Sequence, residues 1–460
     1  MTQSAAQPTT GHKPVRQLHL NANVLASGRH DAAWRLSDNP RSVDDVDAFC
    51  EIARIAERGT FDAVFFADGP QLAADFDRRP WHSLDPVVLL AAMARATERV
   101  GLVATASTTF NEPYEVARRF ATLDHVSGGR AAWNIVTSQS DDAAANFGHP
   151  RMPGHAERYA RAEEFVDVVV KLWDSFEDEA LLADPVTGRY ADPARVHRID
   201  HVGPAFRVRG PLNVPRAPQG RPMIVQAGDS GPSRRLGARW ADALFTVQRT
   251  CTEAQAFYAQ LKGLAAANGR DPDSLVILPG LYTVVGSTQA EARRRREEMD
   301  ALLDLDVQVA LLAERLNVDP QRLTLDRPLP DDIDGQGGAG ITSGFVENIL
   351  REARRENLTV RQLLGRNPFG GHRLVVGTPE QIADNMERWF RGRAADGFNL
   401  NMDAYPSGLE LFVDHVVPEL RRRGLFRTAY EGVTLRSHLG LPRAPSRYAP
   451  ASPGLVAATR

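Results

Sequence analysis

Polar side chains that can bind an anion or an aromatic ring system occur at several points in the first half of the chain. They are Asp68, Thr105, Ser107, Asn134, Thr137, Ser138, His155, Tyr159, Gly228, Asp229 and Ser230. His155 and Tyr159 are four residues apart, so on a helix both project from one face. Hydroxyl groups and a glycine beside a helix N-terminus suit a phosphate group. The set predicts a mononucleotide site, in which Asp229 is unfavourable unless its carboxylate points away or caps the helix.

Each of these residues also has a purely structural interpretation. Asp68 is suited to cap a turn, and Thr105 to bond the backbone at the end of a strand. His155 fits an exposed position in the first turn of a helix. Ser230 is as good an N-cap as a phosphate ligand. Taken singly these signals are weak, and it is their position after successive strands that favours a ligand site.

Eight strand-like segments, followed by helical segments, would bring these residues together. The strands are expected at 17–24, 61–67, 100–105, 131–136, 223–227, 242–247, 275–285 and 398–402. In barrels built from β–α units, polar residues just past the carboxyl ends of the strands form the ligand site. The alternation favours an α/β fold, a (β/α)8 TIM barrel, over two doubly wound domains.

Capping signals mark where several of the helices begin. Ser42, with Asp45 three residues later, predicts a helix over 42–57 with Ser42 as its N-cap. Thr378 and Gln381 form a second capping-box pattern, with proline at the first helical position. Further helices are expected at 86–97, 111–125, 155–173, 252–267 and 409–423.

Two long insertions interrupt the alternation. Residues 175–221 follow the fourth strand and its helix, and residues 286–372 follow the seventh strand. Barrel insertions usually lie at the C-terminal rim, where they can cover the site. Within the second insertion, 335–340 matches a dinucleotide-binding pattern but follows an acidic loop, which favours a lid hinge. We expect one barrel domain over 16–441, between a disordered N-terminus (1–15) and a disordered tail (442–460).

Composition limits the class of protein. The 460 residues carry a net charge of −3, with 25% charged residues, which argues against a general nucleic-acid binder. Only Cys50 and Cys251 could form a disulfide, and no metal-ligand spacing is convincing, so we expect no metal. Neither a membrane span nor a signal peptide is recognisable. A cytoplasmic protein without a membrane partner is therefore expected.

Several long motifs resemble the FMN-dependent monooxygenases of the bacterial-luciferase superfamily. The similarity is to the branch that contains nitrilotriacetate monooxygenase and dibenzothiophene-sulfone monooxygenase, and it runs from about residue 17 to 441. The motifs include 108–114 (TTFNEPY), 123–130 (LDHVSGGR), 133–138 (WNIVTS), 158–165 (RYARAEEF), 208–216 (VRGPLNVPR) and 374–381 (LVVGTPEQ).

The resemblance implies a luciferase-like barrel and a two-component enzyme. A separate NAD(P)H:flavin reductase would supply reduced FMN, which with O2 would form a C4a-hydroperoxide and oxidise a small organic substrate at a C–N, C–S or C–H bond. Homodimers or homotetramers would be usual. The flavin contacts of the family would fall on Asp68, Thr105, His155, Tyr159 and Ser230, and we add Asn134, Thr137 and Gly228. His155 is also a candidate catalytic proton donor or peroxide stabiliser.

Other functions remain open at this stage. The same fold suits a deazaflavin (F420)-dependent hydride-transfer oxidoreductase, or a flavin-binding protein without catalytic activity. A phosphate-handling isomerase or aldolase would leave the motifs unexplained. Arg29, His30 and Trp34, after the first strand, could meet an anionic or aromatic substrate or close the rim of the barrel.

Overall fold

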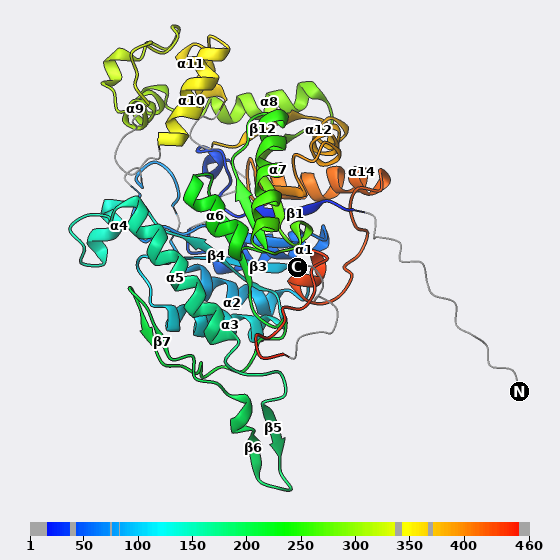
Figure 1. The fold of residues 1–460 in the computed structure, drawn as a ribbon. Helices are drawn as coiled ribbons and strands as arrows, with labels where there is room; N and C mark the ends of the chain where they lie inside the picture. The colour runs from blue at the N-terminus through cyan, green and yellow to red at the C-terminus, as the bar shows by residue number, and fades with distance from the viewer. Residues whose placement is uncertain are drawn as a thin grey trace, which may run out of the picture.

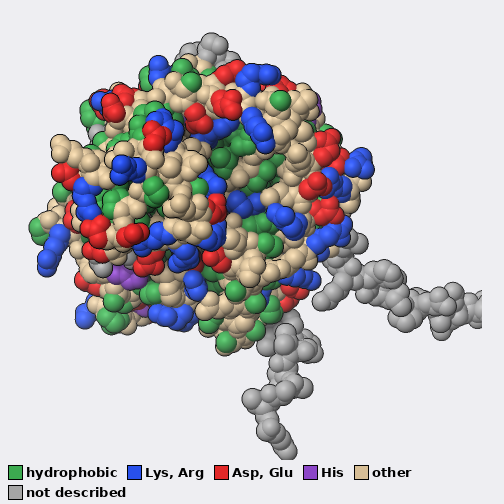
Figure 2. All heavy atoms as spheres, turned by 90° about the horizontal axis from the view of Figure 1, so that it is seen from above, with side chains coloured by type: hydrophobic (Ala, Val, Ile, Leu, Met, Phe, Trp, Pro, Cys, Tyr) green, Lys and Arg blue, Asp and Glu red, His purple; other side chains and the backbone are tan. Residues whose placement is uncertain are grey.

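The computed structural model describes residues 16–36, 43–73, 76–81, 83–335, 343–366 and 371–449. Expectations for 1–15, for most of the glycine-rich segment 335–340, for Ser42 and for 450–460 lie outside the described residues. Among the described residues, no helix is both long and apolar enough to cross a membrane. Positive and negative side chains are interspersed over the face seen in Figure 2.

Eight parallel strands close into a barrel. They are β1 (His19–Asn23), β2 (Ala63–Phe66), β3 (Gly101–Ser107), β4 (Ala131–Val136), β9 (Met223–Ala227), β10 (Ala243–Thr246), β11 (Val276–Val285) and β13 (Gly397–Met402). In space they follow one another in this order; β13 pairs with β1, and β10 pairs with both β9 and β11. The predicted TIM barrel is confirmed, and each expected strand overlaps an observed one.

Helices surround the barrel, because the outward side chains of the strands are apolar and need cover. The surrounding helices are α1 (Val46–Arg58), α2 (Pro86–Ala96), α3 (Pro113–Ser127), α5 (His155–Trp173), α6 (Gly231–Trp240), α7 (Cys251–Ala267) and α12 (Pro379–Arg391). Trp133 of β4 shows the packing: its ring lies within 6.3 Å, centroid to centroid, of Phe120, Phe165 and Trp173. The predicted helix 409–423 is divided into α13 (Ser407–Leu411), a π-helical turn (Phe412–Val416) and α14 (Val417–Arg422).

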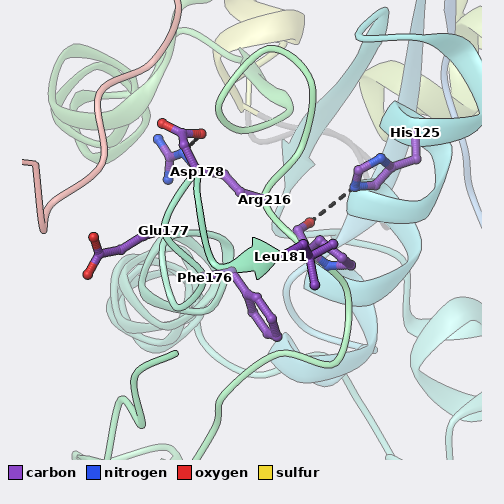
Figure 3. A pocket seen from close by; sticks show the side chains of 7 residues that line it. His125, Phe176, Glu177, Asp178, Leu181 and Arg216 are labelled. Atoms are coloured by element: carbon purple, nitrogen blue, oxygen red, sulfur yellow. Dashed lines mark hydrogen bonds and ion pairs between the residues drawn. The ribbon is translucent and has the colours of Figure 1, made fainter. Parts of the chain in front are cut away.

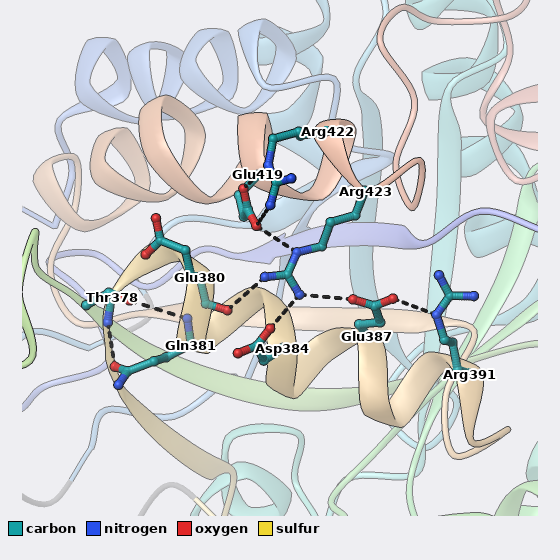
Figure 4. Close-up of polar contacts among 9 residues, drawn as sticks. All are labelled: Thr378, Glu380, Gln381, Asp384, Glu387, Arg391, Glu419, Arg422 and Arg423. Carbon is teal, nitrogen blue, oxygen red and sulfur yellow. Dashed lines mark hydrogen bonds and ion pairs between the residues drawn. The ribbon is translucent and has the colours of Figure 1, made fainter.

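The two capping predictions had different outcomes. Thr378 and Gln381 form the predicted capping box at the start of α12, which Figure 4 shows. Helix α1, however, begins four residues later than predicted. Asp45, not Ser42, is its N-cap, and the Asp45 carboxylate accepts from the Ala48 amide at 2.9 Å. Aspartate is as good an N-cap as serine, and here Asp45, three residues after Ser42, takes that position.

Arg423, just after α14, ties that helix to α12. Its guanidinium contacts Asp384 at 2.7 Å, Glu387 at 2.9 Å and Glu419 at 2.7 Å. These contacts hold the pKa of Glu419 down to about 2, through hydrogen bonds from Arg422 and Arg423. The network joins the helices that precede and follow β13 in the chain and so supports the last strand of the barrel.

A short helix, α15 (Leu435–His438), closes the end of the barrel at which the strands begin. Leu435, Leu439 and Leu441 belong to the same buried cluster as the inward side chains Phe65, Val103, Ala132, Val225, Phe245 and Leu278. Arg436 of α15 makes two contacts with the Asp242 carboxylate, at 3.1 and 2.8 Å, and both residues are buried. The barrel is therefore open at one end only, the end at which the strands finish.

The insertion 175–221 was expected near the C-terminal rim, and this expectation was wrong. The segment lies between α5 and β9, and a connection from a helix back to a strand is at the opposite end of the barrel. It contains the hairpin β5 (Leu181–Asp184) with β6 (Arg189–Ala191), and the pair β7 (His201–Val202) with β8 (Arg207–Val208). Figure 1 shows the hairpin projecting away from α9, α10 and α11.

A surface pocket of about 370 Å³ lies at the base of this insertion (Figure 3). His125, at the end of α3, is hydrogen bonded through Nε2 to the Pro215 carbonyl at 3.1 Å. Behind it, the buried pair Arg216 and Asp174 anchors the insertion to the end of α5. The pocket is thus far along the barrel axis from the predicted ligand site.

The insertion 286–372 does lie at the C-terminal end. Its helices are α8 (Gln289–Asp300), α9 (Leu305–Leu316), α10 (Ser343–Arg355) and α11 (Val360–Gly365), and they share a small apolar core of their own. One strand was not predicted: β12 (Arg373–Gly377) pairs with the far half of β11, beyond the stretch that pairs with β10. Because β11 is ten residues long, it has room for this ninth strand.

The ordered chain extends beyond the predicted boundary at 441. Ala444 is buried, and its carbonyl accepts from Arg216 at 2.8 Å. Arg443 contacts Asp178, and its Nε donates to the Pro218 carbonyl at 3.0 Å. Residues 442–449 therefore pack on the insertion 175–221, and their assignment to a disordered tail was wrong. The composition of this segment gave no sign of these contacts, which bind it to a distant part of the chain.

His438 in α15 should make the protein sensitive to acid. Burial lowers the pKa of its imidazole from 6.5 to about 4, against a smaller opposing effect of the Gly432 backbone. Because the unfolded chain binds this proton more readily, stability is lost as the pH falls from about 6.5 to 4, with about 2 kcal/mol lost by pH 5. We would measure the free energy of unfolding in urea at pH 7.5 and at pH 5. Between these two pH values, His438→Leu should lose about 2 kcal/mol less of this free energy than the parent does. An equal loss in both proteins would contradict the prediction.

Candidate functional site

The open end of the barrel brings the predicted site residues onto one arc. Asp68 follows β2, Thr105 is in β3, Asn134 is in β4 and Thr137 follows it, and Gly228 follows β9. These four strands are consecutive around the barrel. Tyr159 and His155 come from α5, which follows β4 and the short helix α4 (Asp141–Asn146). We call the mouth above β2, β3, β4 and β9 the polar arc.

Thr105 and Asn134 form the inner contact of the polar arc. They are paired in register, and the Asn134 amide donates to Thr105 Oγ1 at 2.9 Å. The threonine hydroxyl donates to the Phe66 carbonyl at 2.8 Å, so Thr105 also bonds the backbone at the end of a strand. Asn134 Oδ1 is buried and has no partner among the described residues. A buried acceptor without a donor is costly unless a bound molecule supplies one.

The loop beyond β4 is held by hydroxyl groups. Ser138 has a positive φ of 49°, and its hydroxyl donates to Ser107 Oγ at 2.8 Å. The Thr137 carbonyl accepts from Thr109 Oγ1 at 2.7 Å. The loops after β3 and β4 are therefore joined to each other, and Thr137 is held through its backbone carbonyl.

Asp68 lies in a setting that disfavours its charge. Burial, followed by the charge of nearby Asp85, raises the pKa of its carboxyl to about 6, against a bond from the Gly69 amide. Near neutral pH, a fraction of the Asp68 carboxyl groups is therefore protonated. It can accept or donate a hydrogen bond at the rim of the polar arc. A simple turn cap would not require such a setting.

The start of α5 presents two aromatic side chains and one arginine. The rings of His155 and Tyr159 lie 4.8 Å apart, centroid to centroid, as their spacing predicts. Arg158 lies between them in sequence; burial lowers its pKa, and its Nε is buried without a described partner. Its Nη1 donates to the Pro153 carbonyl at 2.6 Å. Arg158 was not among the predicted site residues, although its position in the first turn of the helix was a usable signal.

The β9–α6 connection resolves the difficulty posed by Asp229. Its carboxylate pairs with Arg234 at 2.9 Å, one turn into α6, and is therefore neutralised by its own helix. Ser230 caps α6 by accepting from the Ser233 amide at 3.4 Å. Gly228 has φ of +142°, and a Cβ there would lie 2.4 Å from Ser233 Oγ. The connection is a tight turn that leaves the first amides of α6 directed at the mouth.

Asparagines on the inner wall were not predicted. Asn21 and Asn23 of β1 and Asn399 and Asn401 of β13 are buried and alternate with outward apolar residues. Asn23 Nδ2 donates to Asn401 Oδ1 at 2.7 Å. The Oδ1 atoms of Asn21, Asn23 and Asn399 have no described partner. The alternation of asparagine with leucine or alanine in both strands was the signal that could have identified them.

The three residues proposed to face a substrate are separated by the structure. His30 is buried and its Nε2 lies 3.1 Å from Asp300 Oδ1, so it joins the β1 loop to α8. Trp34 is 42% exposed and lines a rim pocket of about 350 Å³ together with Asp31, Arg79 and Leu311. Arg29 is half-buried at the mouth itself. His30 therefore closes the rim, whereas Arg29 remains available to a ligand.

The polar arc fits a mononucleotide. The start of α6 offers amides and a hydroxyl, α5 offers His155, Tyr159 and Arg158, and the inner wall offers the unpaired oxygen of Asn134. Together these are donors for a phosphate at one side and partners for a ring system deeper in the barrel. Within the described ranges, no group of three His, Cys, Asp or Glu residues could hold a metal ion.

Comparison with known proteins gives consistent results. The family model described as "Luciferase-like monooxygenase" matches residues 23–397. Nitrilotriacetate monooxygenase component A of Aminobacter aminovorans is 46% identical over 93% of this chain and 97% of its own. Dibenzothiophene-sulfone monooxygenase of Rhodococcus erythropolis (strain XP) is 40% identical over 93% and 97%. A riboflavin lyase structure with modified FMN and riboflavin has a TM-score of 0.80 at 34% identity, covering 92% of this chain and 96% of its own.

Proposed function

Because the chain belongs to the family of luciferase-like monooxygenases, we propose that it uses reduced FMN and O2 to oxidise a small organic substrate. The observation that carries this proposal is the polar arc. It combines donors for a phosphate at the starts of α5 and α6 with a buried, unpaired Asn134 oxygen on the barrel wall. The FMN in the similar riboflavin lyase structure supports the choice of flavin.

The residues divide into two groups by what they would hold. The first group would hold the phosphate, and it consists of Ser230, Tyr159, His155, Arg158 and the turn at Gly228. Their hydroxyl, ring and guanidinium donors lie near the starts of two helices, where anions are favoured.

The second group lies deeper in the barrel. Thr105 and Asn134 would contact the ring system, with Asp68 at its edge and Thr137 in the adjoining loop. Asn134 would gain the donor that its oxygen lacks.

When bound, reduced flavin supplies the two electrons with which O2 is divided between substrate and water. The chain itself binds the flavin, orients the substrate and keeps water out. The end of the barrel at which the strands begin helps to exclude water, because α15 fills it with leucine side chains. His155 is placed to move a proton at its ring nitrogens. A separate NAD(P)H:flavin reductase would supply the reduced FMN. We propose that the enzyme oxidises its substrate at a C–N, C–S or C–H bond.

An anaerobic titration of the purified protein tests the function. Reduced FMN, reduced FAD and reduced deazaflavin would be compared for affinity, and oxygen would then be admitted. We expect reduced FMN to bind best and oxygen uptake to follow. Binding of deazaflavin alone would instead support hydride transfer. Tight binding of oxidised FMN without substrate-dependent oxygen uptake would indicate a flavin-binding protein.

His155→Asn in the same assay tests the proton role of His155. If the variant forms product with the full yield per oxygen consumed, His155 has no such role. Riboflavin in place of FMN tests the phosphate site, since only FMN should depend on Ser230 and Tyr159.

A further inference from the structure

Three positively charged or protonatable side chains lie at the mouth of the barrel on the side opposite the polar arc. Arg29 follows β1, Arg249 follows β10, and His372 immediately precedes β12. Around the barrel, β10, β11, β13 and β1 form the half that the polar arc leaves free. We call Arg29, Arg249 and His372 the cationic arc. None of them has a role in the flavin site described above.

Backbone contacts fix two members of the cationic arc over the strand ends. The Arg29 amide donates to the Met402 carbonyl at 2.7 Å, where β13 finishes. A Cβ on Gly280 would lie 2.0 Å from His372 Nδ1, so the imidazole rests against this point of β11. Gly280 is two residues past Leu278, which faces the barrel interior. His372 therefore covers the inner wall of β11, where a side chain on residue 280 would otherwise be.

The cationic arc contains more positive charge than its carboxylates neutralise. Burial lowers the pKa of Arg29, and Asp31, which opposes this, is also 3.4 Å from Arg79. Glu352 is 3.1 Å from Arg249 and 3.6 Å from Arg366, whose nearer partner is Glu356 at 2.5 Å. Each carboxylate is thus shared between two guanidinium groups. Burial, followed by the charges of Arg29 and Arg249, lowers the pKa of His372 to about 3.

The same three side chains have buried atoms without partners. Arg29 Nε, Arg249 Nε and His372 Nδ1 have no hydrogen-bond partner among the described residues. All three side chains are nevertheless half-buried, not sealed, so part of each is accessible. Partly desolvated donors around an excess of positive charge are unfavourable in an empty site. An anion that accepts their hydrogen bonds would remove that cost.

We propose that the cationic arc is a subsite for the carboxylate group of the substrate, held beside the flavin that the polar arc would bind. The inference rests on the proposed function and narrows it to an anionic, carboxylate-bearing class of substrate. Arg29 and Arg249 supply the charge, and His372 supplies a hydrogen bond next to Gly280. The two arcs face each other across one mouth, so the rest of such a substrate would extend over the flavin.

Calorimetric titration of the full chain with citrate, succinate and uncharged succinamide tests this subsite without turnover. Citrate or succinate should bind, and succinamide should not. Arg29→Gln and Arg249→Gln should each weaken carboxylate binding about 10-fold, since one charged hydrogen-bonding group is lost. Arg29→Lys is a second test in case the glutamine variant folds poorly. It keeps the charge and should retain most of the affinity for carboxylates. Arg54→Gln, on the exposed face of α1, is the matched control and should change nothing.

Three outcomes would overturn the subsite. They are succinamide binding as well as succinate, no carboxylate binding at all, and an equal loss of affinity in Arg54→Gln. A fourth outcome would also overturn it. If the arginine variants lose affinity for reduced FMN but not for riboflavin, the cationic arc holds the phosphate of the cofactor and not a carboxylate of the substrate. Carboxylate binding that depends on Arg29, in a protein that binds no reduced flavin, would retain the subsite and reject the proposed function.

Discussion

Replacing Arg436 with methionine is expected to lower the free energy of unfolding by about 3–5 kcal/mol. Arg436 is 4% exposed, and its guanidinium contacts the Asp242 carboxylate, which is 5% exposed, at 3.1 and 2.8 Å. Methionine fills similar space but leaves that carboxylate without its main partner. Against the effect of burial, Arg436 and, to a smaller extent, Arg221 lower the pKa of Asp242. The carboxylate would therefore be buried with only the weaker counter-charge of Arg221.

Urea unfolding of four proteins measures this effect: the parent, Arg436→Met, Asp242→Asn and the double variant. The double variant should recover most of the loss, because asparagine can still accept from the Ile224 amide, which now bonds Asp242 at 2.9 Å. A single Arg436→Met within about 1 kcal/mol of the parent would show that the pair is not needed to close the barrel. Reduced FMN binding should stay unchanged in any variant that remains folded, since the pair is at the opposite end.

Gly228→Ala is expected to weaken the binding of reduced FMN about 100-fold while leaving riboflavin almost unaffected. At φ of +142° an alanine is strained, and its Cβ would lie 2.4 Å from Ser233 Oγ. Relief of that contact must shift the turn or the first residues of α6. Ser230 and the α6 amides would then be displaced, which removes two or more charged hydrogen bonds to the phosphate, each worth about 1.5–3 kcal/mol.

Fluorescence or calorimetric titration with both flavins under anaerobic conditions measures the ratio of affinities. Gly263→Ala is the matched control, because a Cβ at this glycine in α7 meets nothing within 4 Å. That control should bind both flavins normally and gain about 0.5–1 kcal/mol of stability. Equal losses for FMN and riboflavin in Gly228→Ala would place the effect on the ring system or the fold and count against a phosphate site at α6.

Strands and capped helices were readable because their signals are local. The apolar run at β2 and the capping box at Thr378 depend on a few neighbouring residues, and both were found. In contrast, β12 is a five-residue strand whose existence depends on the unusual length of β11. The packing of 442–449 likewise depends on Arg216 and Asp178, more than 200 residues away. Nothing near such segments in sequence records these partners.

The placement of the first insertion failed for a topological reason. Insertions at the C-terminal rim follow a strand, whereas 175–221 follows a helix. Because it follows α5, it must lie where strands begin. The predicted order of elements already contains this information.

The candidate site was partly readable. The residues after β2, β3, β4 and β9 were found because they are polar at the ends of apolar strands. Arg158 and the four inner-wall asparagines were not predicted, because Arg158 lies within a helix and the asparagines lie within β1 and β13 instead of after them. Of the cationic arc, only Arg29 was identified as a candidate. Arg249 and His372 are 123 residues apart in sequence numbering, and only closure of the barrel brings the charge of Arg249 close enough to act on His372.

Closure by α15 has a consequence for the synthesis of the chain. The barrel is completed by β13, which pairs with β1, and its lower end is filled by Leu435 and Leu439. Until β13 and α15 have been synthesised, β1 therefore has an unpaired edge, and the apolar side chains that Leu435 and Leu439 cover are exposed. Exposed strand edges and apolar surface favour association with other chains. The nascent chain is therefore most prone to association before β13 and α15 have emerged from the ribosome.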